Sequence, residues 1–243
     1  MKNLEHYHLL AELFKYPDKD IITTVAKIQD FLNKNYPDAG AEFKRFSEFI
    51  ANSTYAQVEE IFQKTFHIQA ICFLDIGYVI FAEDYKRGEF LVNMKAEQEK
   101  YNNNCDGELA DNLPYVLRLL PLHKDEAFVN ELVVMALIPA LEKMLSEFSD
   151  QKTQIREKVM NKKQKVVIME GIKDGNIYKN ALSALIKVFK IDFEDIVFDK
   201  EVEIIPAYAK AFLHSDCGDG CTSTVPTPEE IKQRSRQMLN NAN

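Results

Sequence analysis

Residues 58–81 decide the fold of this chain, and they read VEEIFQKTFHIQAICFLDIGYVIF. Apolar residues recur in this stretch at three- and four-residue spacing, and further apolar residues cover much of the remaining surface. A helix that is apolar on every side needs protein on every side. His67 and Asp75 lie within the run and argue against a membrane span. We therefore predict that residues 58–81 form one central, buried helix.

A polar turn at residues 83–88 follows the apolar run, and a second helical pattern comes directly after it. Asp84 is expected to cap this second helix. A glycine inside a helix costs about 1 kcal/mol relative to alanine, so Gly88 predicts close packing against the central helix. After an Asn-rich break, Asp111 is expected to cap the next helix, with Pro114 in its first turn.

Amphipathic helical patterns continue on both sides of this stretch. Each has one apolar stripe and a charged back, and short helices of this kind gain stability by packing on one another. Ser53-Thr54 and Asp125 are expected caps, and Pro139 should kink or split a long helix. The sequence therefore predicts an all-α, antiparallel helical bundle of about eight to ten helices. The further helices are expected near residues 4–14, 22–32, 43–50, 115–120, 126–148, 181–189 and 204–213.

The composition changes near the C-terminus. Residues 1–213 are expected to form the helical domain, and residues 214–243 a flexible, Cys-containing tail with a short terminal helix that starts near Thr227. Residues 150–175 are rich in Lys, Gln and Glu at their start, which indicates a solvated helix or loop. Residues 166–169 are interpreted as helix, because a lone strand would have no partner.

The bulk numbers restrict the class of protein. The chain has 243 residues, of which 46% are hydrophobic and 28% charged, so it can bury a sizeable core. A formal net charge of -8 disfavours a nucleic-acid binder, because phosphate contacts need clustered Lys and Arg. It is compatible with a basic peptide as partner. We see no export signal and no apolar run long enough to span a membrane, and expect a cytoplasmic protein with Cys72 as a buried free thiol.

Catalytic and cofactor motifs are missing, so we expect no enzymatic activity and no cofactor. One cluster of metal-ligand types remains in the tail. His214, Cys217 and Cys221 are close enough in sequence to hold zinc or contact an iron–sulfur cluster. The alternative interpretation is a flexible tail with two free thiols or a disulfide formed on handling. His6 and His8 are two residues apart and lie on different sides of a helix, which is poor geometry for shared ligation.

Two motifs stand in a recognisable order and separation. The first is Asp84-Tyr85-Lys86-Arg87-Gly88, and the second is Glu108-Leu109-Ala110-Asp111-Asn112-Leu113-Pro114. Together with the apolar run before them, they resemble the respiratory nitrate reductase delta subunit family. These are the NarJ-type molybdenum-cofactor assembly chaperones, relatives of the TorD and DmsD redox-enzyme chaperones. The chain departs from the family pattern at Glu83, where the family usually has glycine.

The resemblance implies an all-helical protein without catalytic activity. Members of this family bind the catalytic subunit of a molybdenum oxidoreductase before that subunit is complete. They recognise an N-terminal peptide of the subunit, keep it competent for insertion of the molybdenum cofactor, and hold back membrane docking or export. A groove between helices can accept such a peptide as an amphipathic helix with its apolar face inward.

The resemblance also implies roles for residues of the first motif and of the helix before it. Tyr78 and Phe81 would line or back the client groove. Asp84 and Arg87 would fix the turn and contact the client. The implied client-binding set is therefore Tyr78, Phe81, Asp84, Arg87, Glu108, Asp111, Leu113 and Pro114.

In the second motif, Glu108 and Asp111 would offer carboxylates at the groove edge. Leu113 and Pro114 would set the loop that shapes the groove. On this view, Asp84→Ala and Asp111→Ala should leave the fold intact while weakening client capture.

Two other functions fit the sequence. One is a general helical adaptor with an unrelated client, which the identity of the bound partner would separate from a chaperone. The other is a metal or iron–sulfur carrier that uses the tail with Cys217 and Cys221, which bound metal would reveal. A homodimer is compatible with each of these functions.

Overall fold

The computed structural model describes residues 3–68, 70–149 and 176–196, and these residues form helices and no strand. The predicted all-α class is therefore confirmed. The helices are α1 (His6–Ala11) with the 3-10 turn η1 (Glu12–Phe14), α2 (Ile21–Asn35), α3 (Pro37–Ala51), α4 (Tyr55–Phe66), α5 (Ile76–Phe81), α6 (Lys86–Lys100), α7 (Leu113–Leu122), α8 (Glu126–Glu131), the π-helical η2 (Leu132–Leu137), α9 (Ile138–Ser146) and α11 (Tyr178–Asp192).

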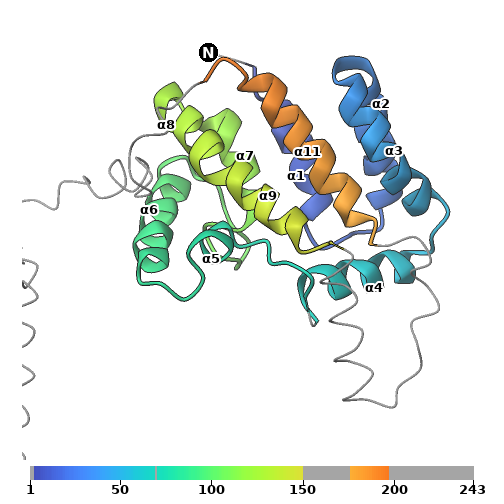
Figure 1. The fold of residues 1–243 in the computed structure, drawn as a ribbon, viewed down its shortest axis with the longest axis horizontal. Helices are drawn as coiled ribbons and strands as arrows, with labels where there is room; N and C mark the ends of the chain where they lie inside the picture. Colours follow the sequence, from blue (N-terminus) through green and yellow to red (C-terminus); the bar gives the residue numbers. More distant parts are fainter. Residues whose placement is uncertain (1–2, 69, 150–175, 197–243) are drawn as a thin grey trace, which may run out of the picture. The chain divides into compact units, whose positions relative to one another are not determined.

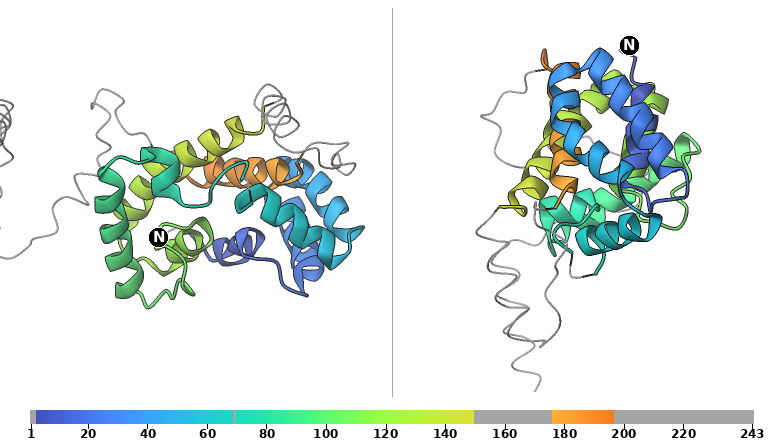
Figure 2. Two further views of the ribbon diagram at one scale, coloured as in Figure 1. Left: turned by 90° about the horizontal axis from the view of Figure 1, so that it is seen from below. Right: turned by 90° about the vertical axis from the view of Figure 1, so that its right-hand side faces the viewer.

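The helix α11 lies at the centre of the described bundle, between α3 and α9 (Figure 1). Its apolar residues are almost all buried, so this helix is enclosed by its neighbours on most of its surface. The α2–α3 pair lies at one end of the bundle and α6 lies at the other (Figures 1 and 2). The helix α5 packs against both α6 and α9 and so joins α6 to the helix beside α11.

The single central helix expected over residues 58–81 is wrong. The structure divides this stretch into α4, which ends at Phe66, and the short α5, which begins at Ile76. His67 leaves helical geometry with φ -123° and ψ -63°. The N–H groups of Ile71 and Cys72 then both donate to the carbonyl of Thr65, at 2.8 and 3.2 Å, and fold the chain back on the end of α4.

The apolar residues between α4 and α5 are buried without being helical. Cys72 and Leu74 are almost fully buried in the core, which confirms the expected buried thiol. The Thr65 hydroxyl donates to the Ile61 carbonyl at 2.6 Å and accepts from Asn176 Nδ2 at 2.6 Å. The apolar character of residues 58–81 therefore indicated burial correctly. Burial alone, however, does not distinguish a helix from a buried connecting segment.

The local start and stop signals were more reliable. Thr54 forms a capping box with Gln57, and Asp125 Oδ1 accepts from the N–H groups of Ala127 and Phe128 at 2.9 and 3.2 Å. Pro139 was expected to kink or split the long helix, but it does not split it, because the backbone stays helical from α8 through η2 into α9, with αR angles at Leu132 and Ile138. Because proline has no N–H to donate, the hydrogen-bond pattern changes from α to π in η2, just before Pro139.

Several predictions fall on residues outside the described ranges. These are the helix or loop at residues 150–175, the helix at 204–213, the domain boundary at residue 213 and the tail. Within residues 3–68, 70–149 and 176–196, every helix is too short or too polar to cross a membrane.

Candidate functional site

The predicted site residues separate into two groups and one isolated residue. The first group consists of Tyr78 and Phe81 on α5, Asp84 in the turn after it and Arg87 in the first turn of α6. The second group consists of Asp111, just before α7, and Leu113 and Pro114 in its first turn. Glu108 is exposed and lies in the wall of a groove on another face of α6. The structure therefore does not gather the eight residues around one cleft.

Asp111 joins the two groups. Its Oδ2 accepts a hydrogen bond from the N–H of Gly77 at 2.7 Å, and its carbonyl accepts from the N–H of Ile76 at 3.0 Å. Asp75 and Asn112 form an antiparallel bridge beside it, in which Asn112 Nδ2 donates to Asp75 Oδ1 at 3.0 Å. The second motif therefore satisfies the first N–H groups of α5, which have no acceptor within their own helix.

The position of Asp111 corrects two expectations. The residue was expected to cap α7, but Asn112 is the N-cap of α7 and Asp111 serves α5 instead. It was also expected at the groove edge, but its side chain is 0% exposed. Asp111 can therefore influence a bound partner only through the elements that it holds together. Pro114 lies in the first turn of α7, as predicted.

Burial raises the pKa of Asp111 from its ordinary value of 3.8 to about 6. The hydrogen bond from Gly77 lowers this pKa, the nearby carboxylate of Asp75 raises it, and the guanidinium of Arg87 lowers it. Oδ1 of Asp111 is buried and has no hydrogen-bond partner in the described part of the chain. Ionisation of this buried carboxyl group in the second motif therefore costs free energy.

Gly77, and not Gly88, is the glycine that close packing requires. A Cβ on Gly77 would lie 2.8 Å from Asp111 Oδ2 and 2.9 Å from Cδ1 of Phe90. Gly88 was expected to pack against the central helix, but it is exposed and a Cβ there would meet nothing within 4 Å. The expectation about Gly88 is therefore wrong, and Gly77 had no sequence signal that distinguished it.

The first motif presents an aromatic and cationic surface. The guanidinium carbon of Arg87 lies 5.0 Å from the centre of the Tyr78 ring, and Phe73 meets the same ring edge-on at 4.7 Å. Phe81 is half-buried and lies 5.8 Å from Phe90 of α6, between ring centres. Tyr78, Phe81 and Arg87 therefore join α5 to α6 with part of their surface exposed.

Asp84 was expected to cap α6, but the N-cap is Tyr85, and Asp84 lies one residue before it. Its Oδ1 accepts from the N–H of Lys86, the first residue of α6, at 2.9 Å. The side chain is exposed, so a contact between Asp84 and a partner is sterically open.

An open groove of about 730 Å³ runs along the outer face of α6. One wall is α6 itself, and the other is the loop that leads into the second motif. Val92 on the first wall is 68% exposed and Leu109 on the second is 43% exposed, so apolar side chains face solvent on both sides. The lining residues are Leu91, Val92, Lys95, Gln98, Glu99, Asn102, Asn103, Asn104, Cys105, Glu108, Leu109 and Ala110.

Two buried amides support the loop wall of this groove. Gln98 Nε2 donates to the Ala110 carbonyl at 2.9 Å, which turns its Oε1 toward Asn103. Asn103 Nδ2 then donates to Gln98 Oε1 at 2.6 Å and to the Tyr115 carbonyl at 2.8 Å. Because two acceptors face Nδ2, the orientation of the Asn103 amide is fixed. The loop is therefore tied to α6 and α7 by specific contacts.

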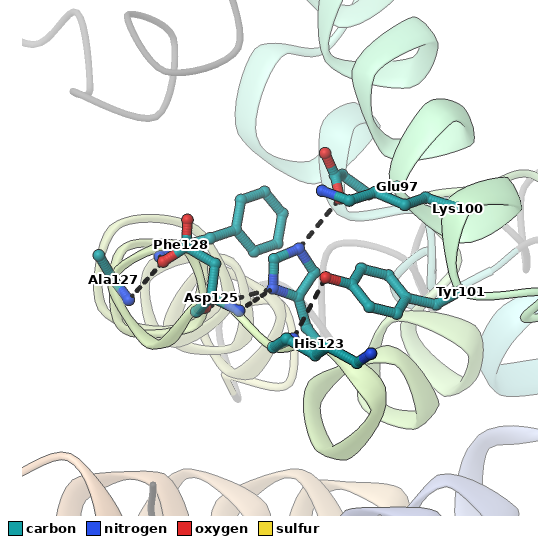
Figure 3. A network of polar contacts seen from close by, with 8 residues as sticks. Glu97, Lys100, Tyr101, His123, Asp125, Ala127 and Phe128 are labelled. Atoms are coloured by element: carbon teal, nitrogen blue, oxygen red, sulfur yellow. Dashed lines mark hydrogen bonds and ion pairs between the residues drawn. The ribbon is translucent and has the colours of Figure 1, made fainter.

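A further polar network connects α6 to the junction of α7 and α8, and sequence reasoning missed it (Figure 3). Nε2 of His123 lies 3.0 Å from Glu97 Oε2, and the N–H of Asp125 donates to His123 Nδ1 at 3.1 Å. Since a carboxylate oxygen can only accept, we assign a ring hydrogen to Nε2, which donates to Glu97. The ring stacks on Phe128 at 4.1 Å and is only 3% exposed. His123 thus attaches α6, the helix that lines the groove, to the junction of α7 and α8.

A second unexpected network lies at the end of α11. Asp192 accepts hydrogen bonds from His6 Nε2 and the Tyr7 hydroxyl, each at 2.8 Å, and from the Tyr36 hydroxyl at 2.7 Å. Burial alone would raise the pKa of Asp192, but these hydrogen bonds outweigh it and lower the pKa below its ordinary value. The partners are more than 150 residues from Asp192 along the chain, so no local pattern could reveal them.

The candidate metal ligands receive no structural account. His214, Cys217 and Cys221 lie outside the described residues. Within the described ranges, no group of three or more His, Cys, Asp or Glu side chains is arranged to hold a metal ion. His6 belongs to the Asp192 network, while His8 lies 3.8 Å from Glu5.

Known proteins offer no further guide to the function. No family model, no curated protein and no solved structure matches this chain, so a functional inference has to start from its own residues.

Proposed function

We propose that this protein is a cytoplasmic assembly chaperone for a nitrate reductase-like molybdenum oxidoreductase. It binds the apo catalytic subunit through an N-terminal peptide of that subunit. It then keeps the subunit competent for molybdenum-cofactor insertion before membrane docking or export. The observation that carries this proposal is the groove on α6, because Glu108 and Leu109 of the second family-like motif form part of its loop wall.

The dimensions of the groove suit a peptide helix. Its lining runs along α6 from Leu91 to Glu99, which corresponds to roughly 12 Å at the helical rise of 1.5 Å per residue. That length accommodates about two helical turns of a partner. Val92 and Leu109 would contact the apolar face of this helix from the two walls.

The charges of the groove favour a basic peptide. Glu99 and Glu108 contribute two carboxylates to the lining, whereas Lys95 contributes one ammonium group. The whole chain carries a formal net charge of -8, which adds a long-range attraction for a cationic partner. Such charges at a rim accelerate encounter more than they strengthen the complex, which suits a chaperone that must release its client.

The first experiment is affinity capture from native cells grown without oxygen, followed by mass spectrometry. The wild-type chain should retain a molybdenum-enzyme catalytic subunit as its dominant partner. The double variant Val92→Asp/Leu109→Asp should lose it, because both substitutions place a carboxylate in the apolar contact. Ile22→Asp is the matched control, since Ile22 is also 43% exposed but lies on α2, at the other end of the bundle.

A synthetic peptide with the N-terminal sequence of the captured subunit tests the mode of binding. Glu99→Lys/Glu108→Lys should slow its association and flatten the salt dependence of the rate. Capture of no molybdenum-enzyme subunit would contradict the chaperone function. If the Val92→Asp/Leu109→Asp variant still captures the subunit, the client binds at a site other than the α6 groove.

A further inference from the structure

The loop wall of the α6 groove continues directly into the buried carboxyl group of Asp111. Residues 105–110 form this wall, and Ala110 is the neighbour of Asp111 in the chain. On the far side of Asp111, the N–H of Leu113 donates to the Leu74 carbonyl at 2.9 Å. The bonds from Ile76 and Gly77 to Asp111 complete the attachment to α5. These contacts, which we call the Asp111 anchor, attach the C-terminal end of the wall to α5, while Gln98 and Asn103 tie the wall to α6 and α7.

The Asp111 anchor contains an unsatisfied oxygen and an unfavourable charge. Oδ2 has the N–H of Gly77 as its donor, but the buried Oδ1 has none in the described residues. Asp75, from the segment before α5, acts on the carboxyl group with a like charge, and Arg87, from α6, acts on it with an opposite one. A buried carboxylate with one open acceptor position is costly, and protonation removes most of that cost.

We propose that Asp111 is a proton-controlled latch at the joint between the groove wall and α5: the anchor holds the C-terminal end of the wall to α5 when the Asp111 carboxyl is protonated, and this attachment loosens when the carboxyl is ionised. The reason is thermodynamic linkage. Opening the anchor exposes Asp111 to water, where a carboxyl group holds its proton less tightly than it does when buried. A proton therefore binds the closed form more strongly than the open form and shifts the equilibrium toward closure.

The expected size of the effect follows from the two proton affinities. The pKa of Asp111 is about 6 when buried, against an ordinary value of 3.8 for the exposed group. With these values, the equilibrium constant for opening should be about tenfold smaller at pH 5.0 than at pH 7.5. The direction is the opposite of ordinary acid destabilisation, because here a lower pH strengthens the contact.

Amide hydrogen exchange measured by NMR tests the latch in the complete chain without any partner. The reporters are the N–H groups of Ile76, Gly77 and Leu113, which donate within the anchor. Their protection factors, corrected for the intrinsic exchange rate at each pH, should be about tenfold higher at pH 5.0 than at pH 7.5. In Asp111→Asn, which keeps the acceptor for Gly77 but cannot ionise, they should not change with pH.

The matched control is Glu108→Gln, which removes an exposed carboxylate from the same loop and should retain the pH dependence. A ¹³C titration of the Asp111 carboxyl in the wild-type chain gives a second test if Asp111→Asn does not fold. Its midpoint should lie near pH 6, and a midpoint below pH 5 would overturn the proposal. An equal pH response of core amides in α3 and α11 would also overturn it, because Asp111 would then act on global unfolding and not on the groove wall.

Discussion

The N–H of Gly77 donates to Asp111 Oδ2 across 2.7 Å, and no space remains between them for a side chain at position 77. This contact fixes the distance between α5 and the start of α7. It joins the second motif to α5, whereas Asp84 of the first motif bonds the first N–H of α6.

Gly77→Ala should destabilise the protein by about 1–3 kcal/mol. The new Cβ would lie 2.8 Å from Asp111 Oδ2 and 2.9 Å from Phe90, so the anchor or the Phe90 ring has to move. Guanidinium unfolding monitored by circular dichroism measures the change. Gly88→Ala is the control, because a Cβ there meets nothing within 4 Å and alanine favours the helix by up to about 1 kcal/mol. Similar effects of the two substitutions would contradict the packing described for Gly77.

Asp111→Ala should lower the free energy of unfolding by about 1–3 kcal/mol, which differs from the sequence-based expectation of an intact fold. The substitution removes the acceptor of a buried N–H group, and an unsatisfied buried donor is costly. Asp84→Ala removes an exposed acceptor for the N–H of Lys86 and should cost about 1 kcal/mol or less. Chemical denaturation at pH 7 compares the two variants, and equal losses would show that Asp111 has no special structural role.

Asp192→Asn should destabilise the protein by roughly 2–3 kcal/mol at pH 7, because three donors face a carboxylate that the amide replaces poorly. The pKa of Asp192 is lowered in the folded protein, so this stabilisation is fully present above about pH 4. It is lost as the pH falls through the lower folded value. Unfolding curves at several pH values should therefore show the wild-type and variant proteins converging in acid.

Tyrosine variants provide the control for the Asp192 network. Tyr36→Phe should cost about 1 kcal/mol, since it removes one hydrogen bond to a charged acceptor. Tyr16→Phe removes a hydroxyl that bonds Glu59 at the exposed surface and should cost much less. A larger loss for Tyr16→Phe than for Tyr36→Phe would be inconsistent with the role given to Asp192.

His123→Ala should destabilise the protein by about 3 kcal/mol and loosen α6. The ring is almost fully buried, stacks on Phe128 and bonds Glu97, and its removal leaves a cavity and leaves Glu97 with Lys100 as its partner (Figure 3). Hydrogen exchange should show faster opening of α6 than of α3 in this variant. Glu97→Ala is the partner control, because it keeps the ring and its stacking and should cost less. Unchanged exchange in α6 would exclude the link from His123 to the groove helix.

Much of the fold could be predicted because its signals are local. Thr54 and Asp125 act on backbone groups within a few residues, and each caps its helix as predicted. The helix expected over residues 58–81 failed for the opposite reason. The break between α4 and α5 depends on the path of the chain through the core. The periodicity of residues 58–81 contains no information about that path.

The site was less predictable than the fold. The motifs singled out Asp111, but they did not indicate that its side chain turns inward to accept from Gly77, because Gly77 lies 34 residues earlier in the chain. Likewise, nothing near His123 indicated Glu97, which is 26 residues away on α6. Contacts of this length depend on how helices pack, and a hydrophobic pattern fixes the buried face of a helix without fixing its neighbours.

The interval of 34 residues between Gly77 and Asp111 also sets an order of assembly during translation. The helix α5 has only six residues, too few to persist alone in water, and its first N–H groups find their acceptors on residue 111. Because the ribosome releases the chain from its N-terminus, the first N–H groups of α5 lack their acceptors until α6 and the following loop have emerged. The N-terminal helices α2 and α3 meet no such delay, since they pack on each other across a single residue, Tyr36.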